Sequence, residues 1–255
     1  MKKSFFTFLM VTLLAGIGFG QNNKAWVELS VRNTEKILND SPWAQTQTET
    51  DTSEMFFSPT RPGTSSTTQA SISSRNKPSD QQSINNNRAD RGATNEAVSV
   101  NYRVRLLSAK PIREAISRTV LLNQVEPGPD LIDQMQTLVD RDFSKFIVVI
   151  VSIDATDGRF LGQSIQAFGS ATTSTLRNGT YLELKDGKRL YLMEYRAPQN
   201  DGLGAKYVFP RMVDGKPFVT AESGTLRFYS EVGGNIKLNV KYKISDMIAD
   251  GKLEY

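Results

Sequence analysis

The sequence predicts an α+β fold: two helices packed on a largely antiparallel sheet that ends in a β-meander, preceded by a disordered linker. Three patterns support this prediction. Apolar and polar residues alternate from Val98 to Leu106, which is the period of a strand with one buried face. Apolar residues recur at helical spacing in residues 111–123 and after Pro129. Beyond Asp157, repeated glycine-containing turn dipeptides separate short strands.

The first twenty residues have the features of a secretory signal peptide. Two lysines precede an apolar run over residues 5–19, and the small residues Gly18 and Gly20 precede Gln21. We expect cleavage between Gly20 and Gln21, a secreted or periplasmic location, and no membrane span after signal removal; a retained membrane anchor is the alternative. Ile17 stands where lipidation needs Cys, so the chain is not expected to be a lipoprotein.

Residues 21–44 are predicted to form a short N-terminal helical segment. A helix this short is marginal alone, and the segment carries a large apolar surface that includes Trp26, Ile37, Leu38 and Trp43. These four residues are therefore the candidates for docking, either on the chain's own domain or on another protein.

Residues 45–95 are predicted to be a disordered polar linker. Of these 51 residues, 28 are Ser, Thr, Asn or Gln. A stretch with so few apolar side chains cannot offset the conformational entropy lost on folding. The linker leaves an α+β domain over residues 96–255, which is long enough to build one hydrophobic core.

Within that domain, each element has its own signal. After the first strand, Pro111 and Pro129 begin the two helices. Residues 146–153 form a continuous run rich in β-branched side chains, typical of a strand that is covered on both faces. Asp-Gly dipeptides at 186, 214 and 250 are expected to form hairpin turns.

Composition excludes several kinds of chemistry. The chain has no Cys and no His, so it has no Ser-His-Asp triad, no Cys-His nucleophile and no zinc site of the usual nitrogen and sulfur type. Removal of Lys2 and Lys3 with the signal peptide leaves a net charge of +2, which does not indicate a nucleic-acid partner. No cofactor and no metal is predicted.

The weak candidates for a catalytic site are Asp154 and Asp157, which follow the buried strand in a turn. Two carboxylates at this spacing lack the further ligands of a calcium loop, and Asp-Gly is also an ordinary turn. Glu183 and Glu194 flank the Asp186 turn, but a two-residue loop would place them about 13 Å apart, beyond the separation in glycosidases.

Two further motifs are better explained without a function. Ser74 and Lys77 match the S-x-x-K of serine acyl-transferases, but they lie in the polar linker and lack the accompanying motifs. Five basic residues, Arg103, Arg105, Lys110, Arg113 and Arg118, are close in sequence. They do not form one helical stripe, and we expect them to lie on a solvated surface.

Two segments carry a resemblance to other proteins. Residues 37–44, Ile-Leu-Asn-Asp-Ser-Pro-Trp-Ala, and the ending from Asp246 to Tyr255 are similar to an uncharacterised group of exported bacterial proteins. That group has an ILNDSPWA-like segment before a variable region and a C-terminal domain of unknown function. The resemblance implies an exported location and this layout. It implies no activity and no catalytic residue.

The sequence favours an exported, non-enzymatic binding or structural module of the cell envelope, whose partner is an envelope protein or polymer. The first alternative is a carboxylate-dependent hydrolase of an envelope polymer, which needs three acids within about 5 Å of one another in a pocket. The second is a carrier of an apolar ligand, which needs a dry cavity of several hundred cubic ångströms.

Overall fold

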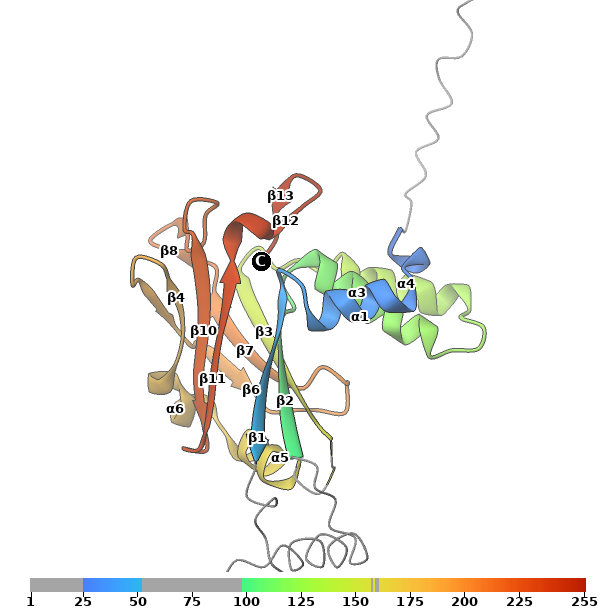
Figure 1. Ribbon diagram of the computed structural model, residues 1–255. Helices are drawn as coiled ribbons and strands as arrows, with labels where there is room; N and C mark the ends of the chain where they lie inside the picture. The colour runs from blue at the N-terminus through green and yellow to red at the C-terminus, as the bar shows by residue number, and fades with distance from the viewer. Residues whose placement is uncertain (1–24, 52–97, 157, 159–160) are drawn as a thin grey trace, which may run out of the picture.

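The computed structural model describes residues 25–51, 98–156, 158 and 161–255. Helices and antiparallel sheets are both present, so the predicted α+β class is confirmed (Figure 1). The predicted signal peptide, Asp157, Ser74 and Lys77, and the linker from residue 52 onward lie outside the described residues.

The helices are η1 (Ala25–Glu28), α1 (Val31–Asn39), α3 (Lys110–Leu122), α4 (Pro129–Val139), α5 (Leu161–Ser170), α6 (Thr173–Leu176), η4 (Arg177–Gly179) and η5 (Ile244–Asp246). The strands are β1 (Ala44–Asp51), β2 (Val98–Leu106), β3 (Phe146–Ala155), β4 (Thr180–Leu184), β5 (Arg189–Tyr191), β6 (Glu194–Arg196), β7 (Ala205–Pro210), β8 (Met212–Val213), β9 (Lys216–Pro217), β10 (Thr225–Val232), β11 (Ile236–Lys243), β12 (Ile248–Ala249) and β13 (Lys252–Leu253). None of these helices has the length and hydrophobicity needed to span a bilayer.

Two antiparallel sheets form the body of the protein. Their strand orders are β1-β2-β3-β7-β6 and β11-β10-β4-β5. They are joined at one side where the chain passes from β5 to β6: Leu192 N–H donates to Thr180 of β4, and Met193 N–H donates to Val208 of β7. At the other side, the Gln47 side chain of β1 bonds Lys237 O and Asn239 N of β11. The sheets therefore enclose the core between them.

That core is continuous across both sheets. On the face of the first strand that was predicted to be buried, Tyr102, Val104 and Leu106 are almost fully buried, and Val100 is partly buried. They meet aromatic side chains such as Tyr207 and Phe228, whose rings contact edge to face at 5.2 Å. Burial of each large apolar side chain contributes roughly 1.5–3 kcal/mol relative to exposure.

Strand β3 is covered on both faces, as its continuous apolar run predicts. Its inner side chains Ile147, Val149 and Val151 belong to the main core. Its outer side chains Val148 and Ile150 belong to a second apolar cluster, which includes Ile116 of α3. This explains why the run shows no alternation of polar and apolar residues.

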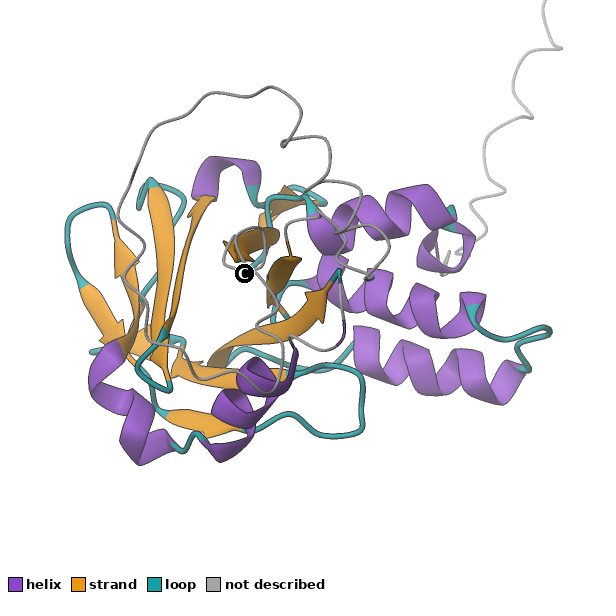
Figure 2. Cartoon of the chain, turned by 60° about the horizontal axis from the view of Figure 1, so that its bottom comes forward, coloured by secondary structure: helices purple, strands orange, loops and turns teal. Residues whose placement is uncertain are grey.

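Helices α1, α3 and α4 lie side by side next to the sheets (Figure 2). Helices α3 and α4 occupy the predicted positions, and each begins with Pro in its first turn. The predicted arrangement of two helices on the sheet is incomplete, because α1 packs on α3, and α5 packs against β3. Helix α5 lies in a region predicted to contain only strands.

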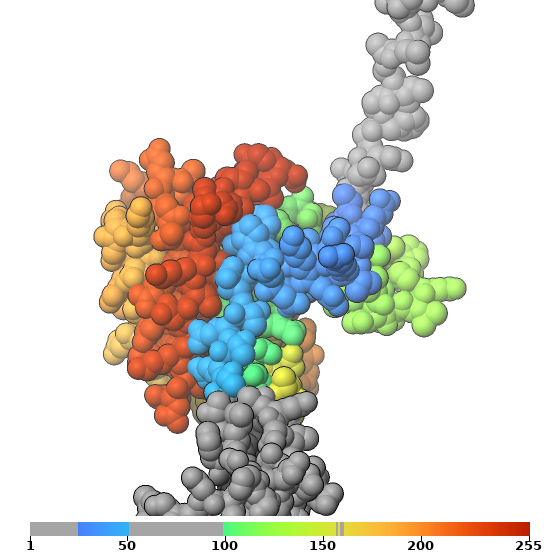
Figure 3. Space-filling model, in the orientation of Figure 1, coloured from blue at the N-terminus to red at the C-terminus, as the bar shows by residue number. Residues whose placement is uncertain are grey.

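The predicted boundary between linker and domain is wrong. Residues 45–51, expected to belong to the linker, form most of β1 and pair with β2 along their whole length. In Figure 3, β1 lies against β11, and the N-terminal helix lies beside the helix pair. Residues 25–51 are thus part of the same fold as the domain predicted at 96–255.

Candidate functional site

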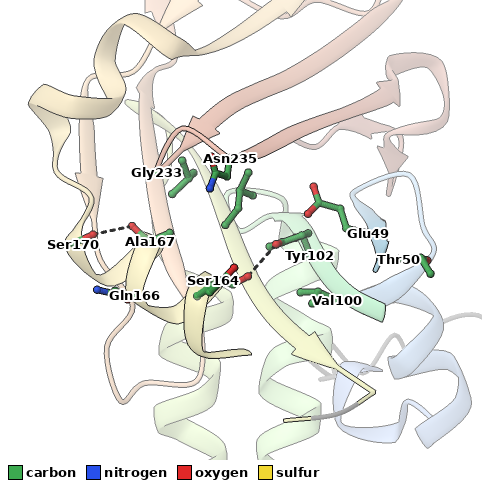
Figure 4. Close-up of a pocket in the computed structure, with 13 residues that line it drawn as sticks. Glu49, Thr50, Val100, Tyr102, Ser164, Gln166, Ala167, Ser170, Gly233 and Asn235 are labelled. Atoms are coloured by element: carbon green, nitrogen blue, oxygen red, sulfur yellow. Dashed lines mark hydrogen bonds between the residues drawn. The ribbon is translucent and has the colours of Figure 1, made fainter. Parts of the chain in front are cut away.

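A pocket of about 610 Å³ lies between β1, β2, helix α5 and the turn from β10 to β11. Figure 4 shows Glu49 and Thr50 on one side, α5 on the opposite side, and Gly233 and Asn235 above them. The volume falls within the range of about 300–1,000 Å³ typical of small-ligand sites. Thr50, Gln163, Gln166, Ser170 and Asn235 are exposed, so the pocket is open to solvent.

The first wall comes from the register of β1 on β2. Glu49 pairs with Val100, and Gln47 pairs with Tyr102. Directly paired residues of an antiparallel ladder point to the same face, and Tyr102 points into the core. Glu49 therefore faces inward, at the end of the sheet where the core opens.

Helix α5 provides the second wall. Its Ser164 and Phe168 are buried and lie four residues apart, on one face of the helix. The Phe168 ring stacks on Tyr102, with centroids 6.1 Å apart. This anchors the helix and places Gln163 and Gln166 at the pocket.

The third wall is the turn between β10 and β11. Gly233 has a φ of 61°, a conformation that glycine adopts at little cost. A Cβ atom at this position would lie 3.0 Å from Cβ of Ala167. Glycine therefore allows the turn to approach α5 closely, and Asn235 completes the rim.

Two hydroxyl groups form the inner end of the pocket. The Tyr102 and Ser164 oxygens are 3.0 Å apart and hydrogen-bonded, and both residues are buried. Burial raises the pKa of the Tyr102 phenol, and the Glu49 carboxylate adds to this increase, while the bond with Ser164 opposes it. The phenol stays protonated at neutral pH, so it is not a base that would activate Ser164 as a nucleophile.

The weak catalytic candidates are not brought together. Asp154 pairs with Asn101 in the ladder and lies on the outer face, away from the pocket, where it accepts a hydrogen bond of 2.7 Å from Arg103. Asp157 is outside the described residues. Over the described ranges, no three acidic side chains are grouped as a metal site would need.

Glu183 and Glu194 lie on strands of different sheets. The two-residue loop expected at the Asp186 turn is wrong. A two-residue loop would place Glu183 opposite Leu190, whereas Glu183 pairs with Arg189, because the loop contains one more residue. Glu183 accepts hydrogen bonds from Arg189 and Arg227. The bond from Arg189 is the main cause that holds the pKa of this carboxyl below its usual range, and the Arg227 bond adds to it.

The four docking candidates all contact the chain's own fold. Trp26 is only 4% exposed and packs with Leu121 and Val139 of α3 and α4; its indole donates to Gln136 at 2.9 Å. Ile37, Leu38 and Trp43 are partly buried and pack against the main core.

The two segments that resemble the exported bacterial group meet in space. The Trp43 indole donates to the Glu254 carbonyl at 2.8 Å, and the Glu254 carboxylate accepts from the Lys110 N–H at the start of α3. The Tyr255 hydroxyl donates to the Val219 carbonyl inside the core. Both segments thus contribute to one structural junction between the N-terminal segment, α3 and the end of the chain.

The expectation that the basic cluster is solvated is wrong for two of its members. Arg105 and Arg113 are buried. Arg105 donates to the Leu38 carbonyl at the end of α1, and Arg113 donates to the Val139 carbonyl at the end of α4. Carbonyls at helix C-termini lack helical partners and carry partial negative charge. Burial lowers the pKa of Arg105 to about 10, so it remains charged at neutral pH.

Sequence reasoning did not identify the pocket. Glu49 and Thr50 fall in the predicted linker, and Gln163, Ser164 and Gln166 fall in a helix that was not predicted. The one available signal was Tyr102, placed on the buried face of its strand. Family models, curated proteins and solved structures were compared with the chain, and none matches it.

Proposed function

We propose that the chain is an exported protein that binds a component of the cell envelope without transforming it, and that the pocket between β1, β2, α5 and the β10–β11 turn is its binding site. The observation that carries the proposal is this pocket of about 610 Å³, lined by hydroxyl, amide and carboxylate groups. Export is supported by the signal-like pattern of residues 1–20.

The chemistry of the lining supports binding. Tyr102 and Ser164 are bonded to each other, and the phenol is held in its protonated form. Gln163, Gln166 and Asn235 have amide side chains, which donate and accept hydrogen bonds but do not titrate. Such groups orient a polar ligand.

The polar groups of the lining also favour this function over carriage of an apolar ligand. An apolar ligand would remove Glu49 and the amides from water without replacing their hydrogen bonds, which is unfavourable. The pocket is open, with five exposed polar residues at its rim. It does not have the dry lining that an apolar carrier needs.

Calorimetric titration of the secreted protein with fragments released from purified bacterial envelopes tests the proposal. We expect saturable binding that is weakened at least about tenfold in a Gln163→Ala, Gln166→Ala double variant. Gln124→Ala is the matched control, because Gln124 is exposed and lies beyond the end of α3. Equal binding by the double variant and the control would reject the pocket as the site.

Export itself is tested by the intact mass of protein recovered from outside the cytoplasm. We expect a chain that begins at Gln21. A full-length mass in the membrane fraction would show that residues 1–20 are retained as an anchor.

A further inference from the structure

Resting on the binding function proposed above, we propose that the pocket takes a neutral oligosaccharide and discriminates against chains that carry carboxylates. The charge, the hydrogen-bonding groups and the apolar surface of the pocket lining each fit such a ligand.

The charge of the lining excludes one class of ligand. Glu49 is the one carboxylate among the described lining residues, and none of these residues is Lys or Arg. Strand β2 carries Arg103 and Arg105, but both point to the face of the sheet away from the pocket. Arg103 donates a hydrogen bond to Asp154, and Arg105 donates one to Ser152. Among the described lining residues, a ligand carboxylate or phosphate would meet the Glu49 carboxylate and no cation that compensates it, and juxtaposed like charges are costly.

The hydrogen-bonding groups match sugar hydroxyls. Each hydroxyl of a sugar both donates and accepts, and so do the amides of Gln163, Gln166 and Asn235. Glu49 adds an acceptor on the wall opposite α5 (Figure 4). A ligand with donors and acceptors on several edges can therefore bond to more than one wall at once.

The apolar part of the lining suits the C–H faces of a sugar ring. Val100, Val232 and Ile236 line the pocket between the polar groups, and Ala167 lies on the α5 side. Burial of aliphatic C–H surface against these side chains is favourable. A neutral sugar has such faces together with a polar edge, whereas an extended polar peptide or an inorganic anion lacks them.

Titration calorimetry of the full mature chain with defined hexasaccharides tests this assignment. The neutral probes are cellohexaose, maltohexaose and N-acetylated chitohexaose, and the anionic probe is a hexamer of galacturonic acid. We expect at least one neutral probe to bind about tenfold or more tightly than the anionic probe at low salt. The difference should shrink in 1 M NaCl, where screening acts within about 3 Å.

A charge variant makes the test specific to Glu49. Glu49→Gln retains the shape and an acceptor, and we expect it to bring the affinities for the neutral and anionic probes to within about threefold of each other. Glu222→Gln is the control, because Glu222 is exposed and outside the pocket. Equal or tighter binding of the anionic probe by the native protein, or unchanged discrimination in Glu49→Gln, would overturn the assignment.

The failure of this assignment can be told apart from failure of the binding function. If envelope fragments bind in a way that depends on Gln163 and Gln166 while no neutral hexasaccharide binds, the ligand class is wrong and the site stands. If neither envelope fragments nor any hexasaccharide binds, both proposals fail.

Discussion

At the scale of the residue, buried polar side chains form hydrogen bonds with backbone atoms more than they form ion pairs with opposite charges. Arg113 donates to the carbonyls of Leu107, Ser108 and Val139, and the Phe143 ring lies against its guanidinium. This is why a basic cluster in the sequence does not form a basic surface. Charge alone could not have predicted this arrangement, because the partners are backbone carbonyls, two from the turn before α3 and one from the distant end of α4.

Trp26 is the side chain that fixes the start of the described fold. We expect Trp26→Ala to lower the free energy of unfolding by about 3–5 kcal/mol, because it leaves a cavity between α3 and α4 and removes the hydrogen bond to Gln136. Urea unfolding followed by circular dichroism measures the change. The control is Val31→Ala, since Val31 is 54% exposed and should change stability by less than about 0.5 kcal/mol. A loss below about 1 kcal/mol for Trp26→Ala would contradict the described packing.

Glu183 is expected to contribute to the pH dependence of stability. Its hydrogen bonds with Arg189 and Arg227 lower its pKa in the folded state. The stabilising contribution is therefore present above the pKa of the unfolded chain and is lost as pH falls through the lower folded pKa. Glu183→Gln should lower Tm at pH 7 and leave it nearly unchanged at pH 2, measured by calorimetry. An equal decrease at both pH values would show that the effect is not electrostatic.

At the scale of the element, local patterns predicted the strands and helices that bury apolar side chains. The alternation in β2, the apolar run of β3 and the prolines that begin α3 and α4 are all local signals. The Asp214 and Asp250 turns also form as expected, and both aspartates have positive φ angles, as two-residue hairpin turns require.

The missed elements are those whose inward side chains are polar or small. In β1, Gln47 bonds the backbone of β11, and Glu49 lines the pocket, so the strand has the composition of a linker. Helix α5 contains Gly162 and Gly169, which have low helix propensity, and one of its two buried residues is the polar Ser164. Both elements are stabilised by contacts with distant segments, which a local pattern does not show.

The structure predicts that residues 52–97 are dispensable for folding. Asp51 and Val98 pair directly at the ends of β1 and β2, the arrangement that a two-residue turn connects. Replacement of residues 52–97 by Asn-Gly should keep the fold and stabilise it by about 2–3 kcal/mol, because the loop that must be closed is much shorter. Loss of cooperative unfolding in the shortened chain, followed by circular dichroism, would show that the replaced residues supply necessary contacts.

At the scale of the whole molecule, the pocket joins segments that are far apart in the sequence. Its walls come from residues 49–50, 100–102, 163–170 and 232–236. No spacing within any one of these segments indicates a site. The pocket could be found only after β1 was placed beside β2 and the β10–β11 turn was placed beside α5.

This organisation predicts that residues 98–255 do not fold as an independent domain. Without residues 25–51, that fragment exposes the edge of β2 and the α3–α4 surface that covers Trp26. We expect it to unfold without a cooperative transition, and to regain one when a peptide of residues 25–51 is added. Calorimetry measures both. A cooperative transition of the fragment alone, unchanged by the peptide, would restore the boundary that the sequence suggested.

The central claim is that the pocket is where this protein binds its ligand, and the most direct measurement is an NMR map of amide shifts as envelope fragments are added to the labelled mature chain. The surface to compare with the pocket is the outer face of the β11-β10-β4-β5 sheet. On this face, the rings of Tyr181, Tyr191 and Tyr229 form a contiguous row. We predict shifts confined to residues 49–50, 100–102, 163–170 and 232–236. Shifts on the tyrosine face with none at the pocket would contradict the claim.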